Sequence, residues 1–504
     1  MKIRILLMVI CTMLCNIASY GQEFKDIPRK KMPKDELPQM ATRAKGEYIM
    51  NEFPTTGEIK GVVILAAFAD VPFSISNDSI NKLLSNRYNA DHYTEEIDFN
   101  EYCNIHEKDL SLQCTIPGSA RDYFRAQSFG QFVPSFDVIG PVTLSQTRSY
   151  YGANNSLGND KNTSTMIREA CQKAYDLGLT GFTDYDNNGD GIVDFVYVVY
   201  AGSDEAQTGI AEAIWAKASK ISLTLGNGMK ISRYACSGEL VIDLPVVAGI
   251  GTLVHEFGHV LGLPDFYNTK AEDFTMDVWS VMDYGMYNAE GFVPCGYTAF
   301  ERYSLGWIPM HTLDEPATMS IGTTDKERKG YRIFTAEAEA DTSSFYLIET
   351  IRKEGWNRYA PANGMLISEV TYDRSAWKDN TVNAEANHRH CIVPANNYWS
   401  IEGDGYNPTK HLFGTANHEF SLTSTPSSRT QFGVAMDKPL TDINYDAKKG
   451  VTTFHFRGGN PTDGIDNSEI RNQKSEFIYD LLGRRVENPS KGIYIVNGVK
   501  VVIK

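Results

Sequence analysis

The chain has 504 residues, of which 42% are hydrophobic and 22% charged, a composition typical of folded globular proteins that excludes a disordered or collagen-like chain. At roughly 100 to 200 residues per domain, this length predicts two to four domains. The formal charge of −15 argues against a nucleic-acid partner, because contacts with phosphates need a basic surface.

The first 21 residues have the features of a signal peptide. Lys2 and Arg4 precede an apolar run over residues 5–15, and small residues follow near Ser19. This run is shorter than the about 20 apolar residues of a transmembrane helix, and no later segment is long enough to span. We therefore expect a secreted or cell-surface protein without a membrane span. Removal of the signal moves the formal charge from −15 to −17.

The next segments predict a polar leader followed by alternating strands and helices. Residues 22–58 are polar and rich in Lys, Pro and Glu, which indicates a propeptide or linker. The near-continuous apolar run at 61–70 predicts a buried strand that opens a domain. Apolar residues at helical spacing predict helices over 119–132 and 165–177. A second apolar run, 192–202, predicts another buried strand.

From about residue 310 the pattern changes to short strands separated by turn residues. This pattern predicts a β-sandwich-like domain over 311–458, a turn-rich linker over 459–475 and a small β module over 476–504. The strands expected in the first of these regions lie at 331–338, 343–352, 364–372, 418–424 and 452–458.

Six cysteines remain after the signal peptide, and none lies in a Cys-x-x-Cys pair. Zinc ribbons and thioredoxin chemistry therefore have no support. Cys103 and Cys114 could close one loop by a disulfide in an oxidising compartment. The alternative is that all six cysteines are small buried apolar residues.

The segment 252–267 contains the pattern His255-Glu256-x-x-His259. On a helix, expected here from about 247 to 262, the two histidines lie one turn apart and can bind one Zn²⁺. Glu256 can reach a water molecule at the metal without being a ligand. If two histidines and a glutamate were buried by chance in so apolar a helix, the lack of partners would reduce the stability of the fold by several kcal/mol, unless something were bound to them. The pattern therefore favours a zinc site.

A third ligand is expected just beyond the helix. Gly262 tolerates the left-handed conformation that ends a helix, and so turns the chain to present Asp265. Carboxylates are accepted zinc ligands, which favours Asp265 as the third. Glu290 and Glu301 are the alternatives.

Residues 279–285 read WSVMDYG and contain a Ser-x-Met-x-Tyr pattern. In metzincins, a turn containing methionine lies beneath the metal-binding histidines, and Met282 fits that position. Tyr284 resembles the tyrosine that in some of these enzymes reaches the zinc or the oxyanion of the transition state.

Together these segments resemble the immune inhibitor A family of secreted bacterial metallopeptidases. The resemblance covers roughly residues 58–310. It implies an α+β, metzincin-like zinc metallopeptidase domain, which we place at 59–310. The segments that carry it are VVILAAFAD (62–70), SARDYFRAQSFGQF (119–132), AEAIWAK (211–217), HEFGHVLGLPDFY (255–267) and the methionine turn; SSFYLIETIRKEGWNRY (343–359) and GMLISEV (364–370) resemble the β-rich region that follows in the family.

The expected activity is that of a zinc-dependent endopeptidase acting on proteins or peptides as a monomer. Zinc lowers the pKa of a bound water, Glu256 accepts its proton during attack on the peptide carbonyl, and Tyr284 helps to stabilise the oxyanion. Residues 22–58 would then be a candidate inhibitory propeptide. The alternative is a non-catalytic surface module that binds protein or carbohydrate, with a structural or lost zinc site.

Residues 183–195 predict a calcium loop. Asp186, Asn188, Asp190 and Asp194 alternate along it, and Gly191 allows the turn that directs the carbonyl of Ile192 inward. Because the glutamate of a full EF-hand is missing, we expect a structural Ca²⁺ ion rather than a sensor. A solvated turn is the alternative.

The C-terminal segment IYDLLGRRVENPSKGIYIVNGVKVVIK (478–504) resembles the sorting tails of type IX-secreted bacterial proteins. The resemblance implies recognition by secretion machinery. The alternative is an accessory β module without a role in transport.

Overall fold

The computed structural model describes residues 53–73, 99–104, 118–156, 158–240, 248–335 and 343–459, and in the tail residues 478–480, 486, 489, 491–496 and 499–503. The predicted signal peptide, residues 22–52 of the predicted propeptide, Cys114 and residues 460–475 of the predicted linker lie outside the described residues. Within them, no helix is long and apolar enough to cross a membrane.

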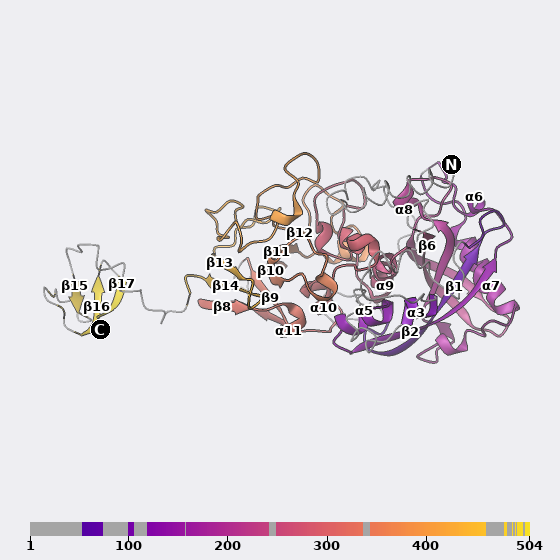
Figure 1. The fold of residues 1–504 in the computed structure, drawn as a ribbon, viewed down its shortest axis with the longest axis horizontal. Helices are drawn as coiled ribbons and strands as arrows, with labels where there is room; N and C mark the ends of the chain where they lie inside the picture. Colours follow the sequence, from indigo (N-terminus) through magenta and orange to yellow (C-terminus); the bar gives the residue numbers. More distant parts are fainter. Residues whose placement is uncertain are drawn as a thin grey trace, which may run out of the picture.

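The N-terminal half of the described chain is built on a mostly parallel sheet with helices on both faces (Figure 1). The strand order is β2-β1-β4-β6-β3, and β5 pairs antiparallel with β6 at the side. The strands are β1 (Gly57–Ala67), β2 (Phe132–Thr143), β3 (Ile192–Val193), β4 (Val196–Ser203), β5 (Lys217–Thr224) and β6 (Lys230–Leu240). This region is therefore a mixed α/β structure.

Short and long helices surround this sheet. The predicted helices at 119–132 and 165–177 are confirmed as α5 and α7, although both are shorter at the C-terminal end. The helices are α3 (Phe99–Asn104), α5 (Ala120–Gln127), α6 (Arg148–Tyr151), α7 (Thr163–Asp176), α8 (Glu205–Thr208), α9 (Gly251–Leu261) and α10 (Ala299–Ser304); the 3-10 turns are η2 (Thr183–Tyr185), η3 (Asp277–Trp279) and η4 (Tyr284–Gly291).

The sheet separates two hydrophobic clusters because successive side chains of a strand point to opposite faces. In β1, Val63 and Leu65 belong to the cluster that contains α9, whereas Val62 and Ile64 belong to the cluster that contains α7. All four are fully buried, which explains why β1 reads as a continuous apolar run. In Figure 1, α9 and α7 accordingly lie on opposite sides of β1.

The predicted strand at 192–202 is interrupted in the structure. Residues 192–193 form β3 and pair with β6, whereas 196–203 form β4, which lies between β1 and β6. Asp194 lies at the interruption, where its carboxylate accepts hydrogen bonds from Asn187 and its backbone N–H donates to Tyr185. These contacts turn the chain back toward the preceding loop.

The region after residue 309 contains two further sheets, with strand orders β12-β11-β10-β9-β7 and β13-β14-β8. Inward-facing side chains of both sheets form one hydrophobic cluster, which includes Ile348 and Ile367 from the first and Phe454 from the second. The elements are β7 (Met310–Thr312), β8 (Ala317–Ile321), α11 (Thr324–Glu327), β9 (Gly330–Phe334), β10 (Ser344–Ile351), η5 (Gly355–Asn357), β11 (Gly364–Thr371), α12 (Arg374–Lys378), β12 (His390–Ile392), η6 (Pro408–Lys410), β13 (Leu440–Asp446) and β14 (Val451–Phe456).

The strand expected at 418–424 is wrong. Phe420 pairs with Leu440 only through an isolated bridge, and Ser421 pairs in the same way with Ser427. Side-chain hydroxyls of this serine-rich segment bond to nearby backbone groups, which replaces the hydrogen bonds of a strand. The other four expected strands appear as β9, β10, β11 and β14.

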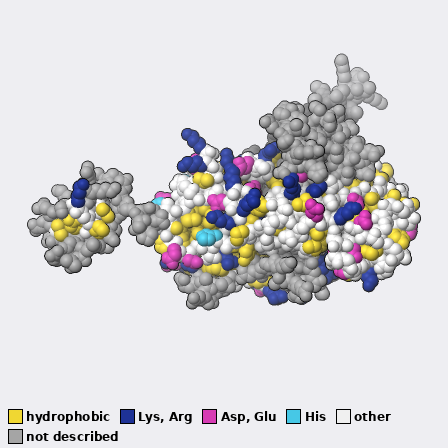
Figure 2. Space-filling model, turned by 90° about the horizontal axis from the view of Figure 1, so that it is seen from below, with side chains coloured by type: hydrophobic (Ala, Val, Ile, Leu, Met, Phe, Trp, Pro, Cys, Tyr) yellow, Lys and Arg dark blue, Asp and Glu magenta, His cyan; other side chains and the backbone are white. Residues whose placement is uncertain are grey.

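The tail forms a small antiparallel sheet of order β15-β16-β17, with strands Ile478–Asp480, Gly492–Val496 and Val499–Ile503. Short strands were expected here. On the described surface that Figure 2 shows, basic and acidic side chains are interspersed rather than gathered by sign.

Candidate metal centre

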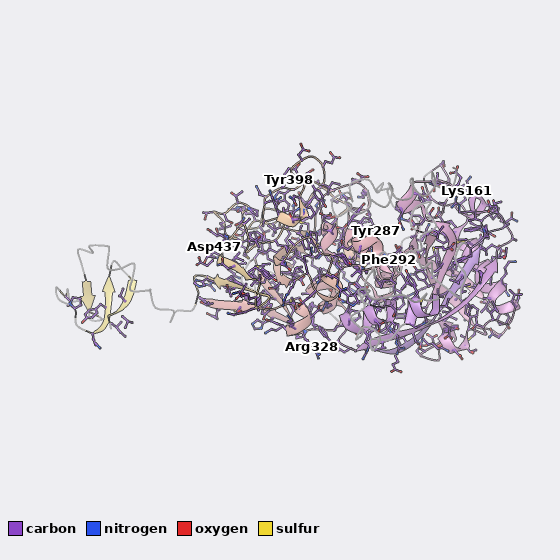
Figure 3. The ribbon with its side chains drawn as sticks, viewed as in Figure 1. Lys161, Tyr287, Phe292, Arg328, Tyr398 and Asp437 are labelled. Atoms are coloured by element: carbon purple, nitrogen blue, oxygen red, sulfur yellow. The ribbon has the colours of Figure 1, made fainter. Side chains whose placement is uncertain are left out.

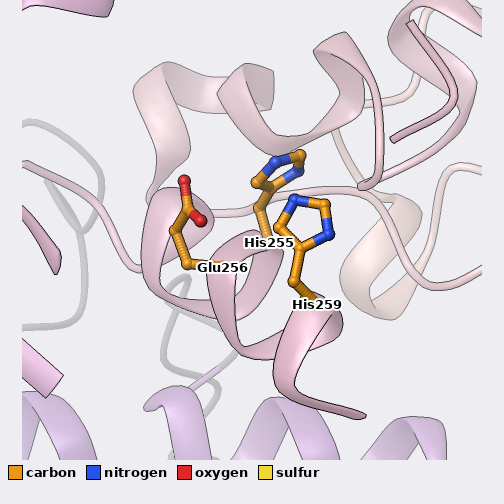
Figure 4. A group of neighbouring side chains, drawn as sticks. All are labelled: His255, Glu256 and His259. Carbon is orange, nitrogen blue, oxygen red and sulfur yellow. The ribbon is translucent and has the colours of Figure 1, made fainter. Parts of the chain in front are cut away.

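Helix α9 carries the predicted zinc motif, and every one of its residues is buried. His255, Glu256 and His259 project from it, and among the described residues they are the group of metal-binding side chains whose ligand atoms all lie within 4.8 Å of one another (Figure 4). The helix begins at Gly251 rather than at 247. It ends at Gly262, whose φ of 108° confirms the expected left-handed conformation.

Backbone carbonyl groups fix the orientation of both imidazole rings. His255 Nδ1 donates to the carbonyl oxygen of Val281 at 2.8 Å, and His259 Nδ1 donates to that of Leu263 at 2.8 Å. Because a carbonyl oxygen only accepts, each ring carries its proton on Nδ1 and directs the lone pair of Nε2 away from the carbonyl. This is the tautomer that a metal ion requires of an Nε2 ligand.

Asp265 lies beside both Nε2 atoms. Its Oδ1 is 3.3 Å from His255 Nε2 and 3.1 Å from His259 Nε2, and the carboxylate is fully buried. Ligands of a tetrahedral zinc ion at about 2.0–2.1 Å lie roughly 3.3 Å apart, so these separations match the edges of such a site. Apart from this contact with each other and with His255, His259 Nε2 and Asp265 Oδ1 have no hydrogen-bond partner. The donor set of two imidazoles and one carboxylate therefore fits zinc.

The charges at this centre are strongly coupled. Burial by itself would raise the pKa of Asp265. The neighbouring His259 and His255 lower it by more than burial raises it, so the carboxyl pKa lies well below its usual range. Burial lowers the pKa of His259, but Asp265 raises it to about 9, so a metal ion that binds Nε2 would have to displace the proton that this atom shares with Asp265. Asp265 is thus ionised at neutral pH and available as an anionic ligand.

Glu256 lies next to these ligands with a free acceptor atom. It is 3% exposed, and its Oε2 is buried without a hydrogen-bond partner. Burial raises its pKa to about 7, although the nearby His255 and His259 oppose this shift. A carboxyl group with this pKa can both accept and release a proton near neutral pH.

Glu301 and Glu290 are the alternatives to Asp265 as the third ligand, and Glu301 is engaged in capping a helix. Glu301 belongs to α10, where its carboxylate accepts hydrogen bonds from Thr298 N and from Ser280 Oγ, both at 2.5 Å. Its backbone and side chain thereby complete a capping box with Thr298. The side chain of Glu290 lies outside the described part of the molecule.

Met282 lies directly against helix α9. A Cβ atom on Gly258 would be only 2.6 Å from Met282 Sδ, so any larger residue there would force the Met282 side chain to shift. The same turn supplies the Val281 carbonyl that holds His255, and Met282 O accepts the N–H of Phe266 at 2.8 Å. The turn therefore supports the helix and the chain that follows it.

Two tyrosines, Tyr267 and Tyr287, lie near the centre, and Tyr284, the one that sequence reasoning singled out, contacts Tyr287. The ring of Tyr284 lies 5.9 Å from that of Tyr287, which Figure 3 labels, and both residues belong to η4, which packs against α9. The ring of Tyr267 stacks on His255 at 6.4 Å. Burial raises the pKa of Tyr267, and the charges of Asp265 and Glu256 raise it further. Burial also raises the pKa of Tyr287, with smaller contributions from Asp204, Tyr284, Glu256 and Asp265.

Sequence signals for the two missed tyrosines were present but weak. Tyr267 follows Asp265 by two positions, and Tyr287 follows Met282 by five. Neither spacing by itself distinguishes a residue of the site from a core aromatic.

The predicted calcium loop forms a compact turn. Asp186 accepts hydrogen bonds from the backbone N–H groups of Gly189, Asp190 and Gly191, and Asp190 Oδ1 accepts from Ile192 N. Asn188 donates to Asp190 Oδ2, while Asp194 Oδ2 accepts from Asn187. Among the described residues, the carboxylates of this loop do not form a close group of the kind found on α9.

Five of the six cysteines are buried: Cys103, Cys171, Cys236, Cys295 and Cys391. A Cys103–Cys114 disulfide remains a prediction, because Cys114 lies outside the described residues.

Comparison with known proteins supports the interpretation of this centre. The matched family model is described as "Immune inhibitor A peptidase M6, catalytic domain" and covers residues 52–307. Pre-pro-metalloprotease PrtV of Vibrio cholerae serotype O1 (strain M66-2) is 25% identical over 277 residues, which cover 49% of this chain and 29% of that protein. Immune inhibitor A of Bacillus thuringiensis subsp. alesti is 26% identical over 257 residues, which cover 45% and 36% of the two chains.

The shared segment is therefore about a third of each relative, whereas the family model covers half of the chain described here. The family model includes all of α9, Asp265 and the methionine turn. The resemblance inferred from sequence is confirmed: the chain belongs to the peptidase M6 (immune inhibitor A) family and carries a metallopeptidase catalytic domain.

Proposed function

We propose that this protein is a secreted, zinc-dependent endopeptidase that hydrolyses peptide bonds of proteins. The observation that carries the proposal is the convergence of His255 Nε2, His259 Nε2 and Asp265 Oδ1 at spacings that suit zinc. The finer assignments belong to the same proposal: a metzincin-like domain over 59–310, a β-sandwich-like domain over 311–458, and a sorting role for the tail.

In this mechanism the protein residues hold the metal and move one proton. A bound zinc ion would lower the pKa of a water molecule toward about 7 and polarise the substrate carbonyl. Glu256 Oε2 accepts the proton of the attacking water and then delivers it to the leaving amine. Its raised pKa of about 7 suits both steps. Val281 and Leu263 keep the two imidazoles oriented through their carbonyl oxygens.

The test is Glu256→Gln in the full mature chain. We expect it to retain zinc while the rate of casein cleavage falls by on the order of 10²–10⁴, because the proton acceptor is lost and the ligands are intact. Zinc content and cleavage rate are the two measurements, and Glu212→Gln on the exposed surface is the control. Full activity of Glu256→Gln would contradict the mechanism. Zinc-loaded wild-type protein that cleaves no protein would favour the alternative, a non-catalytic binding module.

Stabilisation of the oxyanion is assigned to a tyrosine of η4. Tyr284 is the residue that the metzincin pattern indicates, and Tyr287, whose ring lies 5.9 Å from that of Tyr284, is the alternative. Separate Tyr284→Phe and Tyr287→Phe variants decide between them. The functional phenol is the one whose loss lowers kcat with zinc content and KM unchanged.

Calcium binding at Asp186, Asn188, Asp190, Ile192 and Asp194 is the structural part of the proposal. Its support is the alternation of oxygen-bearing residues and the turn made by Gly189 and Gly191, whose φ values are 75° and 82°. Added Ca²⁺ should raise the thermal midpoint of the wild type more than that of Asp190→Asn. Asp176→Asn, on α7, is the control and should respond like the wild type.

A further inference from the structure

The side chain that holds the third candidate ligand comes from far along the chain. Asn380 Nδ2 donates to Asp265 Oδ2 at 2.6 Å, and Asn380 Oδ1 accepts the backbone N–H of Asp265 at 2.6 Å. The two residues are 115 positions apart, and both are buried. Asn380 also lies beyond residues 52–307, the part that matches the family model.

These two hydrogen bonds make the oxygens of Asp265 inequivalent. Oδ2 is engaged by the amide of Asn380, whereas Oδ1 faces the Nε2 atoms of His255 and His259. A carboxylate without such a partner can rotate or bind a metal through both oxygens. With the amide in place, Oδ1 alone is presented to the metal position.

The conformation of Asn380 is itself fixed by the end of helix α12. Asn380 has a φ of 52°, and the N–H of Thr381 returns to the carbonyl of Ala376 at 2.8 Å. Asparagine is one of the few residues other than glycine that adopt this left-handed conformation after a helix. The helix is anchored in turn, since the ring of Trp377 lies 6.3 Å from that of Phe266.

A second asparagine holds the neighbouring backbone without touching Asp265. Asn383 Nδ2 donates to the carbonyl oxygens of Phe266 and His390, and Asn383 Oδ1 accepts from the N–H groups of Arg389 and His390. It therefore joins the same two parts of the chain as Asn380 does. A comparison of Asn380 with Asn383 therefore distinguishes a residue that orients Asp265 from one that only joins these two parts of the chain.

We propose that Asn380 is the positioning residue that orients Asp265 for metal binding, so that the metal centre is completed by the β-rich region after the family-matched part. This inference rests on the proposed function, in which Asp265 is a ligand. Hydrogen-bond partners of metal ligands fix ligand geometry, and their loss weakens metal binding by about 10–100-fold.

The experiment compares variants of the full mature chain by metal affinity and by spectroscopy. Asn380→Gly removes the amide but keeps the left-handed backbone unstrained. Asn380→Asp keeps the size and replaces the donor by a second carboxylate. The dissociation constant for Zn²⁺ is measured by chelator competition, and the visible absorption of the Co²⁺-loaded protein reports ligand geometry.

We expect Asn380→Gly to weaken zinc binding by about 10–100-fold and to change the Co²⁺ spectrum. Asn380→Asp should do the same, and it keeps the test valid if the glycine variant does not fold. The matched control is Asn383→Ser, which should lower the thermal midpoint but leave zinc affinity and the Co²⁺ spectrum unchanged. Wild-type affinity and spectrum in both Asn380 variants would overturn the inference.

Asp265→Ala separates this inference from the proposed function. If Asp265→Ala loses zinc while the Asn380 variants bind it normally, only the positioning role is wrong. If Asp265→Ala itself binds zinc like the wild type, the proposed ligand set is wrong.

Discussion

A single buried carboxyl group, Glu369, is expected to make the stability of this protein depend on pH. It lies on β11 with 1% exposure, opposite Cys391 of β12, and Oε1 accepts the N–H of Gln431 at 2.8 Å. Burial raises its pKa from the usual 4.5 of a glutamate to about 8, while the hydrogen bonds from Gln431, Cys391 and Tyr346 oppose the shift. The folded protein therefore keeps a proton that the unfolded chain releases.

The direction of the pH effect follows from this difference. The contribution of the protonated Glu369 side chain to the free energy of unfolding is fully present below pH 4.5. It decreases between pH 4.5 and about 8, and is lost above that pH. Glu369→Gln stays neutral throughout and should not lose it. Between pH 5 and 7, the wild type should lose about 1.4 kcal/mol per pH unit relative to Glu369→Gln, as measured by urea unfolding. Parallel stability curves for the two proteins would contradict the assignment.

At the scale of elements, the close approach of α9 to the methionine turn depends on one missing side chain. Gly258 lies between the two metal-site histidines in sequence, and a Cβ there would be 2.6 Å from Met282 Sδ and 3.0 Å from Tyr297 Oη. Met282 is fully buried, and Tyr297 donates to the carbonyl of Val254 at 2.9 Å. Neither neighbour can move away freely.

Gly258→Ala is therefore expected to destabilise the fold by about 1–3 kcal/mol through overpacking. Denaturant unfolding measures this loss. In a Met282→Ala background the same substitution should cost less, because the clashing side chain is gone, and the double-mutant cycle isolates that coupling. An equal cost in both backgrounds would show that the contact does not limit the approach.

At the scale of the molecule, one hydrophobic cluster extends across the boundary predicted at residue 310. The cluster around α9 includes Phe345, Trp356 and Trp377 from the β-rich region. Trp356 packs edge-on against Tyr123 of α5 at 4.9 Å. The β-rich region after residue 309 thus covers part of the hydrophobic core against which helix α9 packs.

A chain ended at residue 310 should accordingly lose cooperative unfolding, because these aromatic contacts would be replaced by solvent. The measurement is thermal unfolding followed by circular dichroism, with zinc content as a second readout. The control is a chain ended at 459, which lacks only the linker and tail and should keep the wild-type midpoint. Cooperative unfolding and normal zinc content of the shorter chain would contradict the expectation.

Short-range pattern in the sequence was enough to predict the local parts of the centre. The spacing of His255 and His259 follows from the period of a helix, and the need for a left-handed turn made Gly262 the end of α9. The near-continuous apolar run at 61–70 likewise predicted β1, and apolar residues at helical spacing predicted α5 and α7. These features depend on residues within one or two turns of each other.

Only the tertiary structure decided what surrounds those residues. Asn380 reaches Asp265 across 115 positions, and Val281 fixes the tautomer of His255 across 26. Nothing in the local sequence around either donor or acceptor specifies its distant partner. The sequence by itself therefore determined the family and the helix that carries the metal-site motif, whereas packing between distant segments decided the orientation of its side chains.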